Sequence, residues 1–135
     1  MLTIHTGTNR DAVAVEGDRI AAVADVDALR AGYPGARVRE WPGELRRGAG
    51  WESVLPQAPS PRERVHALLL RGVTAVASGA FDDDPALGPA AARVGLSVGT
   101  PAPLAAGSRA DFAVFAPDGA CLATVLAGRL VHRRT

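Results

Sequence analysis

Three short apolar runs near the C-terminal end place the strongest constraint on how this 135-residue chain can fold. Residues 112–115 (FAVF) are apolar at every position, as in a strand whose sheet is covered on both faces. A turn over 117–119 (PDG) leads to a second run at 122–127, and a tight connection at Gly128 leads to a third at 130–132. The pattern predicts three short consecutive strands, the first of them covered on both faces.

The N-terminal segment predicts a second group of strands. Residues 2–6 alternate in polarity and are expected to form an edge strand. Two apolar runs, 12–15 and 20–23, flank a turn in which Gly17 or Asp18 takes a positive φ, which is typical of a hairpin. The segment ends with a short helix over 26–31, capped by Asp25, and a strand over 36–41.

The middle of the chain predicts two helix–strand units. Residues 42–59 are rich in Gly and Pro without a clear period, and are expected to be loop. Ser60 and Glu63 have the spacing of a capping box, so a helix is expected to start there and end at Gly72. A buried strand over 73–77 follows. Asp84 is then expected to cap another helix, which closes at Gly95.

Two phrases of the sequence resemble the amidohydrolase superfamily, in particular its imidazolonepropionase and dihydroorotase type. The C-terminal phrase is GSRADFAVF followed by ATVLAGRLVHRR, and the N-terminal one is DAVAVEGDRIAAVADVDALRAGYPGARVREWPG. The resemblance covers residues 1–50 and 104–133. It implies a mixed α/β fold whose composite β-sandwich interleaves N-terminal (1–41) and C-terminal (104–133) strands. Two to three helices come from the middle of this single domain.

In the family a metal-binding barrel lies between the two halves of the sandwich. A complete (β/α)₈ barrel takes about 250 residues, so segment 42–103 is expected to be a truncated, barrel-like insert. The family places an H-x-H pair after the first barrel strand, and the matching positions here are Ser53 and Leu55. Leucine cannot bind a metal ion. The resemblance therefore implies that the ligand set is missing, and we expect no catalytic residue, no metal and no cofactor.

Five side chains are the candidates if a metal site exists after all: His5, His66, His132, Asp82 and Asp83. His5 and His132 belong to strands of one expected sandwich, so their rings would be close if the strands were neighbours. The alternative for each is a surface histidine without a partner. His66 is expected beside the apolar stripe of its helix. The simpler expectation for Asp82 and Asp83 is that they favour the positive end of the next helix.

Composition excludes several classes of function. A net charge of +1 gives no electrostatic reason to expect nucleic acid or an anionic membrane as a partner. All 15 basic residues are arginine, so neither a Schiff-base lysine nor a carboxylated lysine can occur. The single cysteine, Cys121, fits a reducing cytoplasm and is expected to be a small core residue. No apolar run approaches the length of a membrane span.

Three functional hypotheses follow from these observations. The first is a non-catalytic binding or assembly module, expected to be a homodimer. In the family the inner surface of the sandwich faces the barrel, so here that apolar area must be covered by the middle segment or by another chain. The second is a residual hydrolase acting on the C–N bonds of small or cyclic amides through new ligands. The third is a small-molecule binder that holds a carboxylate with arginine side chains in a cleft between the sandwich and the helices.

Overall fold

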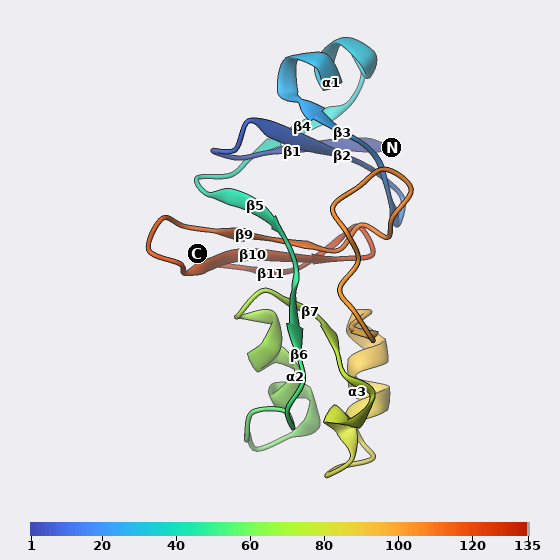
Figure 1. Cartoon of the computed structure of the whole chain (residues 1–135), viewed down its shortest axis with the longest axis vertical. Coiled ribbons are helices and arrows are strands. Elements are labelled where there is room, and N and C mark those ends of the chain that lie inside the picture. Colours follow the sequence, from blue (N-terminus) through green and yellow to red (C-terminus); the bar gives the residue numbers. More distant parts are fainter. Residues whose placement is uncertain (135) are drawn as a thin grey trace.

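The computed structural model describes residues 1–134 and stacks them in four layers along the long axis of the molecule (Figure 1). From one end these layers are a short helix, a first four-stranded sheet, a second four-stranded sheet, and a unit of three parallel strands with two helices. The expected mixed α/β class and the composite β-sandwich are confirmed. No helix within residues 1–134 is long and apolar enough to cross a membrane.

The first sheet comes from the N-terminal part of the chain. Its strands are β1 (Leu2–Thr6), β2 (Asp11–Glu16), β3 (Arg19–Asp25) and β4 (Arg37–Glu40), in the order β3-β2-β1-β4. Helix α1 (Val26–Gly32) covers its outer face, and Asp25 caps that helix as expected. Gly17 takes the predicted positive φ in the β2–β3 turn. The expected edge position of β1 is wrong, because β4 pairs in parallel with its free side.

The second sheet combines the C-terminal strands with one strand from the middle. It contains β5 (Glu44–Arg47), β9 (Phe112–Phe115), β10 (Cys121–Leu126) and β11 (Arg129–Arg133), in the order β11-β10-β9-β5. The resemblance implied that the N- and C-terminal strands would interleave. This expectation is wrong, because the N-terminal strands form the first sheet and the C-terminal strands lie in the second. The expectation of loop over 42–59 is also wrong, since β5 and β6 (Ala49–Trp51) lie inside it.

The alternation of side chains explains why the layers stack. On β2, Val13 and Val15 face the second sheet, while Ala12 and Ala14 pack under α1. On β10, Val125 faces the first sheet from the other side. Because strand side chains alternate between the two faces, Leu126 instead contacts the helical unit beyond the second sheet. Both sheets are thus apolar on both faces, as the FAVF run predicted for one of them.

The last layer is a small open sheet with two helices. Its parallel strands are β6, β7 (Val73–Val76) and β8 (Ser97–Val98), in the order β6-β7-β8. Helix α2 (Pro61–Leu69) connects the first two strands. A 3₁₀ turn, η1 (Ser78–Phe81), and helix α3 (Leu87–Val94) connect the second pair. Ser60 caps α2 by accepting the Glu63 amide, as predicted. The expected cap at Asp84 is wrong, because its carboxylate accepts the Ala86 amide in a turn before α3.

Two polar contacts fix the second sheet to its neighbours. The Thr124 hydroxyl donates to the carbonyl oxygen of Leu69 at 2.6 Å, which ties β10 to α2. Asp111 is 1% exposed, and its carboxylate accepts the Ala127 amide at 2.8 Å and contacts Arg109 at 3.3 Å. The predicted role of Asp111, bonding a backbone amide near a turn, is confirmed. Arg109 also donates to the carbonyl of Gly95, so it connects α3 to the sandwich.

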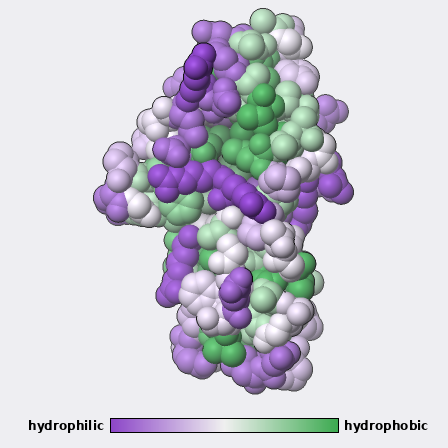
Figure 2. All heavy atoms as spheres, in the orientation of Figure 1, coloured by the Kyte–Doolittle hydropathy of each residue, from purple (hydrophilic) through white to green (hydrophobic). Residues whose placement is uncertain are grey.

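The turns of the two sheets meet at a pair of glycines. A Cβ on Gly128 would lie 2.0 Å from the carbonyl oxygen of Gly17, and Gly128 has a φ of 77°. Both the close approach and the positive φ require glycine. The surface of the stacked layers mixes hydrophilic and hydrophobic residues on the face that Figure 2 shows, with a hydrophobic area over the upper layers.

We expect Asp111→Ala to lower the free energy of unfolding by about 2–4 kcal/mol, because it leaves the buried Ala127 amide without its acceptor and the Arg109 guanidinium without its carboxylate. Denaturant unfolding followed by circular dichroism measures this. The matched control is Asp118→Ala, which removes an exposed aspartate that also accepts one backbone amide, from Ala120. A loss for Asp111→Ala no larger than that of the control would contradict the central role of this carboxylate.

Candidate functional site

His5 lies between the two sheets of the sandwich and has a partner. It is 6% exposed, its Nδ1 accepts the Trp41 indole N–H at 3.2 Å, and its ring meets that of Phe112 edge-on at 5.1 Å. The expectation of a partnerless surface histidine is therefore wrong. Burial, together with the nearby Arg39 and Arg37, lowers the pKa of His5 from 6.5 to about 4. The imidazole is neutral at pH 7 and carries its proton on Nε2.

His132 and His66 are the two histidines that the structure brings together. Their ring centroids are 6.4 Å apart and nearly perpendicular, one ring on β11 and the other on α2. His132 Nε2 lies 3.5 Å from the carbonyl oxygen of Cys121, and burial lowers the pKa of His132, against the effect of that hydrogen bond. Cys121 is the buried core residue that was predicted. His5 is not part of this pair, because it packs against Trp41 on the other face of the sheet.

Two aspartates of the DDD run, Asp83 and Asp84, pair with the guanidinium of Arg64. Arg64 is 6% exposed and donates to Asp83 at 2.8 Å. It also donates to the carbonyl oxygens of Leu55 and Pro56, at 2.9 and 3.1 Å. Asp82 is exposed. Arg64 therefore holds the loop after β6 against the turn after β7, at the carboxyl end of the small sheet.

We compared these side chains with what a metal ion of the family would need. Among the residues of known placement, 1–134, no three His, Cys, Asp or Glu side chains gather around a common point. Leu55, at one expected ligand position, is 1% exposed and packs in the core beside Val65 and Leu68. Structural and catalytic zinc sites use at least three protein ligands. The residues present do not fit the metal centre of the family.

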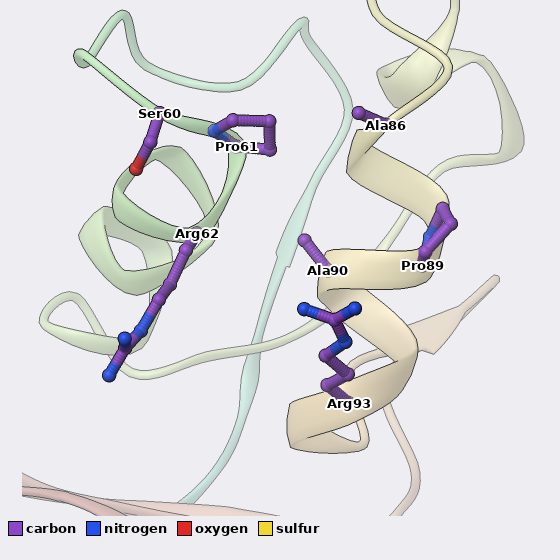
Figure 3. Close-up of a pocket in the computed structure, with 7 residues that line it drawn as sticks. All are labelled: Ser60, Pro61, Arg62, Ala86, Pro89, Ala90 and Arg93. Carbon is purple, nitrogen blue, oxygen red and sulfur yellow. The ribbon is translucent and has the colours of Figure 1, made fainter.

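A cleft between α2 and α3 is lined in part by arginine side chains (Figure 3). It has a volume of about 300 Å³. The side chains that line it are Ser60, Pro61, Arg62, Ala86, Pro89, Ala90 and Arg93. The short side chains of Ala86 and Ala90 leave space between the helices, and Ala90 points across that space toward α2. The cleft is thus a product of small residues on α3 opposite the first turn of α2.

Two arginines give this cleft its charge. The Arg93 guanidinium reaches from α3 into the space between the helices, while Arg62 extends along α2 with its guanidinium directed away from Arg93 (Figure 3). Both side chains are exposed, and neither forms an ion pair with a carboxylate of residues 1–134. Glu63 and His66 lie in an adjoining hollow next to Arg62. The sequence predicted a ligand cleft with arginines between the sandwich and the helices. The cleft described here lies between the helices α2 and α3 instead.

Comparisons with known proteins found one family model and a similar solved structure. Residues 12–36 match the family described as imidazolonepropionase-like composite domain, bacteria. The crystal structure of guanine deaminase from Bradyrhizobium japonicum is similar, with a TM-score of 0.49 and 17% sequence identity, over 65% of this chain and 27% of that one. The chain thus spans about a quarter of the length of that structure. No curated protein sequence matches the chain.

We expect the buried His5 to make folding pH-dependent. Because the folded pKa of about 4 lies below the unfolded value of 6.5, the unfolded state takes up the proton first as the pH falls. The stability that the neutral His5 contributes to the folded state is present in full above pH 6.5. It is lost as the pH falls toward 4, which lowers the free energy of unfolding by about 3 kcal/mol in total.

Urea unfolding at several pH values tests this expectation. His5→Asn keeps an acceptor near the Trp41 N–H but cannot titrate, so its stability should fall less between pH 7 and pH 4.5. Part of the slope should remain, because burial also lowers the pKa of His132. An unchanged slope in His5→Asn would show that His5 is not the group responsible.

Proposed function

We propose, from the premise that this chain carries an imidazolonepropionase-like composite domain of the amidohydrolase superfamily, that it is a non-catalytic binding module. Its ligand in this proposal is a small carboxylate, held by Arg93 and Arg62 in the α2–α3 cleft. The observation that carries the proposal is the pair of exposed guanidiniums, one from each helix, at a cleft in which no described carboxylate pairs with them.

The distribution of metal-binding side chains supports a role without catalysis. His5 is neutral and engaged with Trp41, Asp83 is paired with Arg64, and Leu55 is part of the core. At the carboxyl ends of the three parallel strands, where a barrel enzyme places its chemistry, Arg64 binds backbone carbonyls. The buried guanidinium there stabilises a loop, and within residues 1–134 no three His, Cys, Asp or Glu side chains gather to hold a metal ion that could activate water.

The chemistry of the cleft favours a carboxylate. A guanidinium matches a carboxylate with two parallel N–H···O bonds, and it stays charged at every physiological pH. Arg93 already points into the cleft, and Arg62 is exposed, so a rotation about its side-chain torsions turns it toward the ligand at little cost. Pro89 and Ala90 provide an apolar wall for a short aliphatic chain. A four-carbon dicarboxylate offers one carboxylate for each arginine.

We also propose that two copies associate through the open edge of the small sheet at β8 (Ser97–Val98). The strands β6 and β8 each have one side without a strand partner within residues 1–134. Val98 on β8 is 58% exposed, and Val54 in the loop after β6 is 51% exposed. Hydrophobic residues also reach the surface at this lower end of the molecule in the view of Figure 2. Unpaired strand edges with exposed apolar side chains favour self-association.

We expect succinate to bind the protein at constant ionic strength, and Arg93→Gln to weaken that binding by about 10-fold or more through the loss of a charge-assisted hydrogen bond. Isothermal titration calorimetry measures the affinity, and neutral succinamide is the ligand control. The matched control variant is Arg129→Gln, an exposed arginine at the start of β11. Equal affinity in Arg93→Gln and Arg129→Gln would rule out the cleft as the binding site.

We expect Val98→Lys to convert a dimer to a monomer, because a charged side chain on an exposed strand edge blocks pairing. Light scattering coupled to size-exclusion chromatography gives the mass directly. Leu130→Lys is the control, because Leu130 is 36% exposed but lies on β11 of the second four-stranded sheet. A wild-type protein with the mass of one chain at micromolar concentration would contradict the association.

A further inference from the structure

Two arginines contact one tryptophan at the rim of the sandwich, and a third arginine lies near them. The guanidinium carbon of Arg39 lies 4.9 Å from the centre of the Trp41 ring, and that of Arg133 lies 5.8 Å from it. Arg37 is close enough to Arg39 for their charges to interact. Trp41 itself is 8% exposed, so its indole lies buried beneath the arginine side chains. We call Arg37, Arg39 and Arg133 the rim arginines.

The strand registers explain how these side chains converge. Arg37 and Arg39 alternate with Val38 on β4, and Arg39 lies opposite His5 of β1. His5 faces the second sheet, so Arg37 and Arg39 share that face. Arg133 lies opposite Ala123, whose side chain faces the first sheet. Both β4 and β11 end their sheets, so the three guanidiniums project from two layers toward the same opening.

The charges of the rim arginines are not balanced within the part of the chain that the structure describes. None of the three forms an ion pair with a carboxylate of residues 1–134, and Glu40 and Glu44 pair with Arg30 and Arg46 instead. Burial, followed by the nearby Arg133 and Arg37, lowers the pKa of Arg39. The cation–π contacts with Trp41 offset only part of this repulsion, because an exposed contact of this kind is weak.

We propose that the rim arginines and Trp41 form a second anion site, separate from the α2–α3 cleft, that takes a phosphate or pyrophosphate group. The site bridges the two sheets of the sandwich. A bound phosphate accepts hydrogen bonds from Arg39 of the first sheet and Arg133 of the second, and its charge removes the repulsion between them.

The number and placement of the donors favour phosphate over carboxylate at the rim. A carboxylate offers two oxygens and one negative charge, which serve one guanidinium well. A phosphate ester offers three acceptor oxygens and a charge of about −1.5 to −2, which suits three guanidiniums arranged around one point. Arginine is also the residue that binds phosphate with two parallel hydrogen bonds. The net charge of +1 on the whole chain argues for a compact ligand rather than a long polyanion.

The fluorescence of Trp41 provides a direct test, because the chain has two tryptophans and one can be removed. In a Trp51→Phe background, we expect inorganic pyrophosphate to change the Trp41 emission in a saturable way at constant ionic strength. Arg39→Gln and Arg133→Gln should each raise the apparent Kd by about 10-fold or more. Arg37→Gln, an exposed position, is the third variant and keeps the test valid if either of the others fails to fold.

The matched control is the cleft double variant, Arg62→Gln with Arg93→Gln, which should bind pyrophosphate as the background protein does. Succinate should leave the Trp41 emission unchanged. A saturable change that survives all three rim variants, or no saturable change in the folded background protein, would overturn the rim site. Calorimetry measures the loss of succinate binding in Arg93→Gln separately. The proposal for the cleft and the proposal for the rim can therefore be contradicted independently.

Discussion

The buried carboxylate of Asp111 is the interaction on which the arrangement of layers depends. It accepts the Ala127 amide at the turn between β10 and β11, and it pairs with Arg109, whose other contacts are the Ser97 hydroxyl and the Gly95 carbonyl. One charge with 1% exposure therefore joins the second sheet to the end of α3. A buried carboxylate without these donors would cost several kcal/mol, so the contacts must form together.

The second sheet holds the stack of layers together because both of its faces are covered. Its inner face packs on the first sheet through Phe112 and Val125, and its outer face packs on α2 through Thr124 and Leu126. The three-stranded unit therefore covers the surface that a larger domain would cover. Within residues 1–134, this unit does not form a closed ring of strands, and no three metal-binding side chains gather at its strand ends. Both ligand proposals for this chain therefore rest on arginines, one pair at the α2–α3 cleft and three at the rim of the sandwich.

Local patterns predicted the elements whose partners are close in sequence. The FAVF run, the turn at Gly17 and the Ser60–Glu63 cap were each visible in a few residues. Strand β5 was missed because Leu45 is its one buried side chain and its partner β9 lies far along the chain. The burial of His5 and the α2–α3 cleft were missed for the same reason, since Trp41 and Arg93 reach them from distant elements.

The order of the layers in space differs from their order along the sequence. The strands of the sheet in the middle of the molecule, apart from β5, come last, over residues 112–133. When the chain leaves the ribosome, the first sheet and the three-stranded unit thus emerge with one apolar face each still open. Segment 112–133 follows both outer layers in the sequence and covers an apolar face of each, so we expect those faces to be exposed to aggregation until it is in place.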